Sequence, residues 1–316
     1  SPGPSIKKLV PKVKKTASTL YAMYVVITVL EIACLLIAGM PLFDTLTLSF
    51  GTAGTGGFGV LNTSLGSYPV SQQVIVTIFM IMFGVNFSAY YLVYQRRFKE
   101  ILGMGEVIAY LSIIAVATLL ITWNIAPMYA KGTTALKDAA FQVGSIITTT
   151  GYSSTDFNLW PTFSKAILVT LMFIGACAGS TGGGIKVSRI IILCKTVAKE
   201  LDHQIHPNTV RKLKVDGKQL EHSVLRATNV FIVAYVLVYV ASFLIVTLDN
   251  FDFETSFTAI AATLNNIGPA LGAAGPASNF SQFSYLSKIV MTFDMIAGRL
   301  ELFPIVLLLA PSTWKK

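Results

Sequence analysis

Six long apolar segments decide what this chain can fold into. Several hold about 18 or more residues with few charges, which is enough for a helix to cross the hydrocarbon core of a bilayer. The chain has 316 residues and is 12% charged, about half the charged fraction of a soluble domain. We therefore predict an all-α membrane protein. The predicted spans are Leu20–Ala38, Val74–Tyr94, Val107–Trp123, Ala166–Ala178 continuing past a glycine stretch to Leu193, Val224–Leu248 and Ile289–Leu309.

The positive charges alternate with the spans. Nineteen of the 24 Lys and Arg residues fall into four patches: Lys7–Lys15, Arg96–Lys99, Lys186–Arg226 and Lys315–Lys316. This alternation follows the positive-inside rule, which places the four patches and both ends of the chain in the cytoplasm. Because topology explains the basic charge, the net charge of +9 gives no reason to expect a nucleic-acid partner.

The regions between the spans repeat three times. Each begins with an apolar stretch too short to cross the bilayer, continues into a strip rich in Thr, Asn and Gly, and ends in a polar loop. The short stretches are Phe43–Phe50, Ala135–Ile147 and Phe253–Leu264. We expect them to be re-entrant helices, each between two spans, with the strips on the outer side. Internal repetition is a strong guide to architecture, and it divides the chain into pore repeats at 1–100, 101–215 and 216–316.

The three strips have the composition of a cation filter. Irregular backbone at membrane depth is tolerated where it lines an aqueous path, and extended strips can turn carbonyl oxygens toward a dehydrated ion. We align the strips on Gly56, Gly151 and Gly268. The predicted filter residues, which would bind the cation, are Thr52, Ala53, Gly54, Thr55, Gly56, Thr148, Thr149, Thr150, Gly151, Leu264, Asn265, Asn266, Ile267 and Gly268.

A glycine-rich stretch interrupts the fourth span. Five glycines fall within residues 175–184, and each costs about 1 kcal/mol relative to alanine inside a helix. We expect the helix to unwind there and to form a movable barrier below the strips, although small residues also permit tight helix packing. The predicted gate residues are Gly179, Ser180, Thr181, Gly182, Gly183 and Gly184.

Some charged residues lie deep inside predicted spans, where charge is expensive and faces a cavity or a partner. Arg299 falls about ten residues into the last span, and an anchor at the membrane edge is the alternative interpretation. Glu31 and Asp294 are intramembrane acids, and the sequence does not say which cation either would pair with.

The strips, the sequence Gly-Ser-Thr-Gly-Gly-Gly-Ile-Lys at 179–186 and Gly-Arg-Leu-Glu at 298–301 together resemble the potassium-translocating subunit of the Trk/Ktr/HKT superfamily, closest to its bacterial Trk branch. The resemblance implies a pseudo-fourfold pore in which four repeats each contribute one filter glycine. It implies that residues 179–184 form an intramembrane gating loop, with Arg299 in the permeation path. This chain matches three of the four repeats, and the family's first repeat is not among them.

The resemblance also implies potassium uptake in the cell inner membrane by a homodimer. A cytosolic ring of nucleotide-binding subunits, of the NAD or ATP type, would control it. No motif indicates an enzyme. A sodium- and potassium-permeable transporter like the plant HKT proteins stays open, because the discriminating first repeat is absent. So do a broken-helix secondary transporter and a non-conducting assembly subunit.

Overall fold

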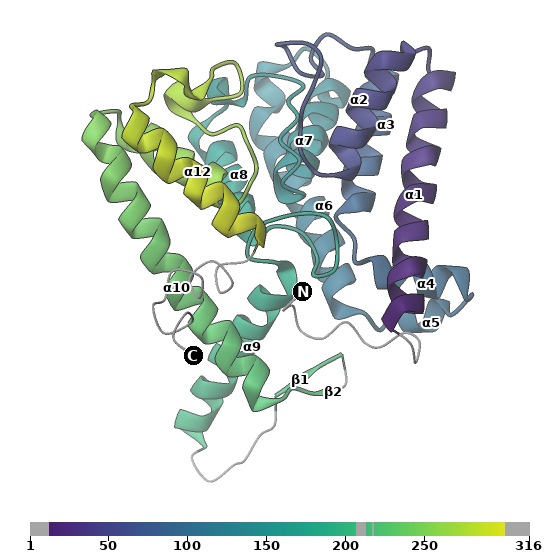
Figure 1. The fold of residues 1–316 in the computed structure, drawn as a ribbon, viewed down its shortest axis with the longest axis vertical. Coiled ribbons are helices and arrows are strands. Elements are labelled where there is room, and N and C mark those ends of the chain that lie inside the picture. The colour runs from purple at the N-terminus through teal and green to yellow at the C-terminus, as the bar shows by residue number, and fades with distance from the viewer. Residues whose placement is uncertain (1–12, 207–212, 217, 301–316) are drawn as a thin grey trace, which may run out of the picture.

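The computed structural model describes residues 13–206, 213–216 and 218–300. Within them, helices form three successive units of one design (Figure 1). In each unit a long helix leads to a short helix, then to an extended strip, then to a further helix that in units 1 and 2 is broken. This confirms the predicted all-α fold. The basic residues up to Lys12, Arg211, Lys212 and the chain from Glu301 onward, with Lys315 and Lys316, lie outside the described residues.

The units, named 1 to 3 in chain order, contain the following elements. Unit 1 holds α1 (Val13–Ile37), α2 (Leu42–Ala53), α3 (Val70–Phe83), α4 (Phe87–Tyr94) and α5 (Phe98–Ile101). Unit 2 holds α6 (Gly105–Ile125), η1 (Ala126–Met128), α7 (Gly132–Ile147), η2 (Phe157–Leu159), α8 (Thr162–Ile174) and α9 (Val187–Ile205). Unit 3 holds β1 (Lys214–Val215), β2 (Lys218–Gln219), α10 (His222–Val246), η3 (Thr247–Asp249), α11 (Phe253–Leu264), η4 (Gly272–Ala274), η5 (Phe280–Gln282) and α12 (Tyr285–Leu300).

The first helix of every unit is long and apolar enough to span a membrane. These helices cover Ala17–Ile37, Gly105–Met128 and His222–Asp249. The short helices α2, α7 and α11 have 12, 16 and 12 residues, so they match the predicted re-entrant stretches. Most residues on α7 and α11 are buried, because these two helices lie inside the bundle.

The second helices of units 1 and 2 are broken. The prediction of one continuous span over Val74–Tyr94 is wrong, because α3 and α4 meet at an angle of 93° across residues 84–86. The phenol oxygen of Tyr110 would lie 2.2 Å from a Cβ on Gly84, so only glycine fits beside it. Asn86 then starts α4 by accepting a hydrogen bond from the Ser88 amide at 2.9 Å. The predicted break at the glycine stretch is confirmed, since α8 ends at Ile174 and α9 begins at Val187.

Neighbouring units pack in the same way. Helix α3 of unit 1 packs against the short helix α7 of unit 2, and α8 of unit 2 packs against the short helix α11 of unit 3. Helix α12 packs on α10 and α11, as Figure 1 shows for α10. Each short helix of units 2 and 3 therefore packs against helices of its own unit and of the preceding unit. This packing brings the strips together.

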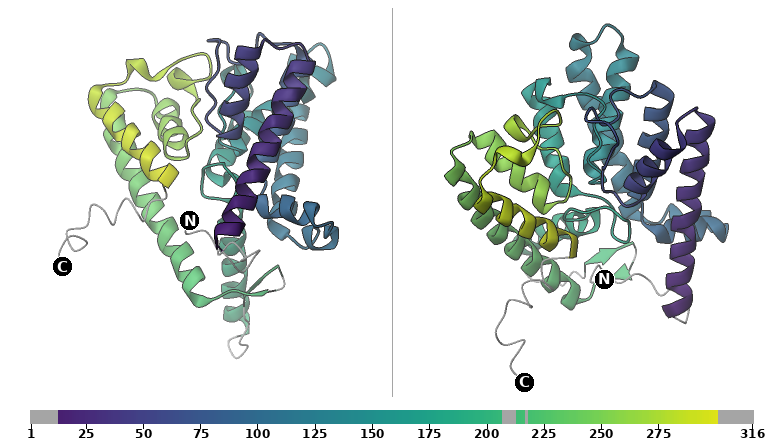
Figure 2. Two further views of the ribbon diagram at one scale, coloured as in Figure 1. Left: turned by 45° about the vertical axis from the view of Figure 1, so that its right-hand side comes forward. Right: turned by 45° about the horizontal axis from the view of Figure 1, so that its top comes forward.

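The end of the molecule opposite the short helices carries α9, the start of α10 and the β1–β2 hairpin (Figure 2). The hairpin is antiparallel, with Val215 paired to Lys218. This end contains the basic stretch between Lys186 and Arg226, so it is the predicted cytoplasmic side.

Candidate functional site

The three strips leave their short helices through the same backbone conformation. The residue after each helix is followed by one with a left-handed φ: Thr55 at 50°, Thr149 at 58° and Asn266 at 57°. The amide of the next residue reaches back five positions to a carbonyl oxygen. These bonds are Gly56 to Gly51 at 2.8 Å, Thr150 to Ser145 at 2.9 Å and Ile267 to Ala262 at 2.8 Å. The three strips that repeat in the sequence thus share one backbone conformation and one hydrogen-bond pattern.

This register corrects the alignment made from the sequence. In each strip, the residue that follows the amide donor of this hydrogen bond has a positive φ: Gly57 at 66°, Gly151 at 87° and Gly268 at 108°. Gly57, and not Gly56, therefore corresponds to Gly151 and Gly268. The two adjacent glycines of the first strip made the sequence ambiguous by one position. Thr52 and Ala53, which the sequence placed in the strip, belong to α2, and the Thr52 hydroxyl donates to the Leu48 carbonyl within that helix.

The strips touch each other in cyclic order. A Cβ on Gly57 would lie 2.0 Å from the carbonyl oxygen of Thr150 in the second strip. A Cβ on Gly151 would lie 1.9 Å from the carbonyl oxygen of Ile267 in the third. Glycine is therefore required at both positions by its positive φ and by the close approach of the next strip. The same contact repeated around an axis arranges the strips as successive sectors of a ring.

The ring is open between the third and first strips. Nothing lies within 4 Å of a Cβ built on Gly268. A cavity of about 700 Å³ occupies this sector, lined by Gly56 and Phe58 on one side and by Gly268, Phe280 and α12 on the other. The described chain therefore forms a ring with one side open.

The loop between α8 and α9, residues 175–186, lies directly under the strips. The Gly183 amide donates to the Thr149 hydroxyl at 2.6 Å. A Cβ on Gly182 would lie 2.9 Å from the Thr148 carbonyl oxygen, and one on Gly183 would lie 2.6 Å from that of Asn265. These contacts require glycine, because any side chain would separate the loop from the second and third strips.

The two ends of the α8–α9 loop are joined at a narrow neck. A Cβ on Gly184 would lie 2.7 Å from Gly175 Cα, and both glycines have positive φ, 75° and 73°. The returning chain pairs with the departing chain through Lys186 N to Ile174 O at 3.0 Å and Val187 N to Ala176 O at 3.1 Å. The loop therefore leaves the end of α8 and returns to the same point before α9 begins.

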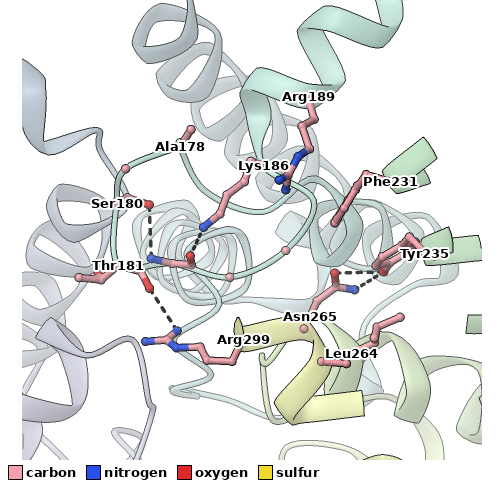
Figure 3. A pocket seen from close by; sticks show the side chains of 16 residues that line it. Ala178, Ser180, Thr181, Lys186, Arg189, Phe231, Tyr235, Leu264, Asn265 and Arg299 are labelled. Atoms are coloured by element: carbon pink, nitrogen blue, oxygen red, sulfur yellow. Dashed lines mark hydrogen bonds between the residues drawn. The ribbon is translucent and has the colours of Figure 1, made fainter. Parts of the chain in front are cut away.

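Arg299 joins this loop to the first strip, and Figure 3 shows its hydrogen bond to Thr181 of the loop. Its Nη1 donates to the carbonyl oxygen of Thr181 at 3.1 Å and to the Thr55 hydroxyl at 3.3 Å. Its Nη2 donates to the carbonyl oxygen of Gly54 at 3.0 Å. The Thr55 hydroxyl also donates to the Thr181 carbonyl at 3.0 Å. The structure therefore brings Arg299 together with the predicted gate residues at the inner end of the strips.

Below the loop is a cavity of about 320 Å³ with a basic lining. Lys186 contributes to it and donates to the Gly182 carbonyl, as Figure 3 shows. The Arg189 guanidinium lies 4.0 Å from the centre of the Phe231 ring, a favourable cation–π distance. On the far wall Tyr235 and Asn265 exchange hydrogen bonds at 3.0 and 2.9 Å, which fixes the end of α11 under the third strip.

The two intramembrane acids are fully buried. Asp294 accepts a hydrogen bond from the Ser242 hydroxyl at 2.8 Å, so it joins α12 to α10. Glu31 lies beside the Thr52 hydroxyl behind the first strip. Among the ion pairs of the described residues, neither acid has a cationic partner.

Sequence reasoning missed one contributor to this site, Glu106, and one role of a predicted filter residue, Thr149. The Thr149 hydroxyl holds the α8–α9 loop, and the Glu106 carboxylate accepts a hydrogen bond from the Ala178 amide at 2.6 Å. Glu106 had a visible signal, because it is an acid at the start of an apolar span. Its partner could not be read from the sequence, since the two residues are 72 positions apart.

Comparison with known proteins identifies the family. A model of the TrkH family, described as cation transport protein, matches residues 107–316. The chain belongs to the TrkH cation transport family. It is 34% identical over 327 residues to the Trk system potassium uptake protein TrkH of Salmonella typhimurium, covering 100% of this chain and 66% of that relative. It is 32% identical over 320 residues to the Trk system potassium uptake protein TrkG of Escherichia coli strain K12, covering 99% of this chain and 65% of TrkG.

A solved structure agrees with the fold. The crystal structure of the potassium transporter TrkH from Vibrio parahaemolyticus superimposes with a TM-score of 0.90 at 34% identity, covering 99% of this chain and 68% of that one. The resemblance to the bacterial Trk branch is therefore confirmed. The chain spans slightly less than two thirds of the length of the curated relatives named above.

Proposed function

We propose that this chain forms three walls of a potassium-selective, gated pore that takes up K+ across the cell inner membrane. The observation that carries the proposal is the threefold strip, with one hydrogen-bond pattern and strips that abut in cyclic order. Strips held this way can present carbonyl oxygens in place of an ion's hydration shell. The relatives are potassium uptake proteins and a potassium transporter by name, and potassium is therefore the ion of this proposal.

The fourth wall of this pore is proposed to come from a segment outside this chain. The open sector beside Gly268 supports this, since a strip placed there would repeat the contact that Gly57 and Gly151 make. In this proposal the filter carbonyls belong to Gly54–Gly57, Thr148–Gly151 and Asn265–Gly268. A homodimer, a cytosolic nucleotide-binding ring and cytoplasmic chain ends remain part of the proposal on the basis of the family resemblance and the basic cytoplasmic patches.

The test of transport uses the full-length gene in a strain that lacks potassium uptake. We expect growth at low potassium and uptake of rubidium, a potassium surrogate, with much slower uptake of sodium. Equal rates for rubidium and sodium would favour the HKT-like alternative. Absence of rescue and of rubidium uptake when the regulatory subunit is co-expressed would count against transport altogether.

We further propose that the α8–α9 loop is the gate. Its contacts with the inner ends of the strips, and the three hydrogen bonds from Arg299, support this role because they place backbone and a positive charge in the path of a cation. Deleting Gly179–Gly184 should raise rubidium flux and reduce its dependence on the regulatory subunit. Unchanged flux in the deletion variant would refute the gate.

A further inference from the structure

A single carboxylate outside the pore lining holds the gate loop from behind. Glu106 is the second residue of α6, and its side chain is half-buried. Its Oε1 accepts the Ala178 amide at 2.6 Å. Ala178 immediately precedes the stretch proposed as the gate. Hydrogen bonds to a charged acceptor are shorter and about twice as strong as those between neutral groups.

Three helices begin at this carboxylate. Glu106 lies in the first turn of α6, beside the side chain of Asn86, which caps α4, and beside the amide and hydroxyl of Ser188 in the first turn of α9. Each helix N-terminus carries about half a positive elementary charge. The convergence of three such ends explains how one acid is accommodated at this depth.

Backbone hydrogen bonds join the two helix breaks into one layer next to Glu106. Cys177 donates to the Gly84 carbonyl at 3.1 Å and Phe87 donates to the Gly179 carbonyl at 3.2 Å. The break between α3 and α4 is therefore paired with the gate loop. Glu106 contacts both sides of this layer, since Asn86 belongs to one break and Ala178 to the other.

The cytoplasmic hairpin connects to the same point. Asp216, in the turn between β1 and β2, accepts a hydrogen bond from the Gly105 amide at 3.0 Å. Lys195 of α9 donates to the Lys214 carbonyl in β1 at 2.9 Å. A displacement of the hairpin would therefore act on the residue next to Glu106 and on α9 together.

We propose that Glu106 is a positioning residue that keeps the gate loop against the filter by holding Ala178, and that the β1–β2 hairpin reaches this hold through Asp216. The proposal rests on the gate role proposed above. It adds Glu106 as the residue that restrains the gate and the β1–β2 hairpin as the cytoplasmic structure that can release it. In the held state, Glu106 restrains the loop from one side and Arg299 from the other. Loss of either hold frees one end of the loop.

The chain supplies its own reporter of this hold. Cys177 is fully buried next to Ala178, and Cys34 lies partly buried on α1 in unit 1. With the exposed Cys194 changed to Ser, N-ethylmaleimide labelling of purified full-length protein in detergent, quantified by mass spectrometry of the two cysteine peptides, gives a ratio of rates. A local release of the loop raises only the Cys177 rate, whereas general unfolding raises both.

We expect Glu106→Gln, which keeps the shape and removes the charge, to raise the Cys177-to-Cys34 ratio about tenfold and to raise rubidium flux without the regulatory subunit. Asp216→Asn should raise the ratio less, and Glu106→Asp should restore most of the protection. Glu100→Gln is the matched control, because Glu100 is an exposed acid on the neighbouring helix α5, paired with Arg97.

An unchanged ratio in Glu106→Gln would overturn the proposal. So would equal rises at both cysteines in Glu106→Gln and Glu106→Asp alike, since these would mean a general structural role. The labelling ratio needs no transport. Absence of rubidium uptake by the wild-type protein therefore refutes the proposed function, while the ratio decides independently whether Glu106 holds the loop.

Discussion

Replacing Gly57 by alanine tests the register of the filter. The backbone of Gly57 has φ +66°, which costs a residue with a side chain about 1–2 kcal/mol. The new Cβ would stand 2.0 Å from the Thr150 carbonyl oxygen, and real Cβ contacts essentially never fall below 3.0 Å. The carbonyl of the neighbouring strip must therefore retreat by about 1 Å, a large fraction of an ion–oxygen distance.

Gly56→Ala is the matched control at the adjacent position. Gly56 has no positive φ, and a Cβ there would meet the Phe58 ring at 3.0 Å and the Gly51 carbonyl oxygen at an ordinary contact distance of 3.9 Å. That ring belongs to a side chain, which can change rotamer, whereas Gly57 faces a backbone carbonyl of the next strip. The two variants add the same methyl group to neighbouring residues of one strip, and the structure predicts different results.

We expect Gly57→Ala to lower rubidium uptake by about 5- to 30-fold, the factor that corresponds to 1–2 kcal/mol, and to reduce preference for rubidium over sodium. Gly56→Ala should stay within about twofold of the wild type. The measurement is uptake into vesicles containing full-length protein at matched expression. A Gly56→Ala defect as large as that of Gly57→Ala would refute the register and the cyclic contact between strips.

Three further changes test individual contacts. Arg299→Ala removes charge-assisted hydrogen bonds from the loop, worth about 1.5–3 kcal/mol, and should raise regulator-independent flux by about tenfold or more; Arg299→Lys should recover only part of the restraint, and no change would contradict the contact. Thr149→Val removes the acceptor of the Gly183 amide and should raise the same flux several-fold, whereas Thr149→Ser should not. Asp252→Ala removes the N-cap of α11, a loss of about 1 kcal/mol that should lower the melting temperature by about 2–4 °C, while Asp252→Asn should preserve it. Hydrogen bonds from the Thr255 side chain and amide hold the pKa of Asp252 below its ordinary value of 3.8. This cap therefore stabilises the protein above pH 4 and is lost as the pH falls through that lowered pKa, so a wild-type and Asp252→Ala difference that persists in acid would contradict it.

The sequence allowed the repeat, the short helices and the glycine break to be predicted, because each rests on local composition. Helices α2, α7 and α11 are too short to span and too apolar to be loops. The break after Ile174 follows from the helix propensity of glycine. Helix length, apolar composition and glycine content are local properties of the sequence, and the fold agrees with what they predict.

What could not be predicted depends on contacts between distant segments. Glycine is required at the bend, at Gly84, because Tyr110 of the next unit lies against it. The choice between Gly56 and Gly57 depends on where the Thr150 carbonyl falls. Glu106 meets Ala178 only because two helix breaks are paired. Single glycines and acids in the sequence carry no information about such partners.

The narrow neck of the α8–α9 loop separates the loop, which is proposed to move, from the helices α8 and α9 that carry it. Because residues 186 and 187 return to pair with residues 174 and 176, the segment from Cys177 to Gly184 can swing without changing the path of α8 or α9. The helices would then keep the filter in shape during each opening, and the energy of gating would be confined to a flap of eight residues. Length and composition of that flap can vary while the surrounding helices stay where they are, so the ease of opening can be adjusted independently of ion selectivity.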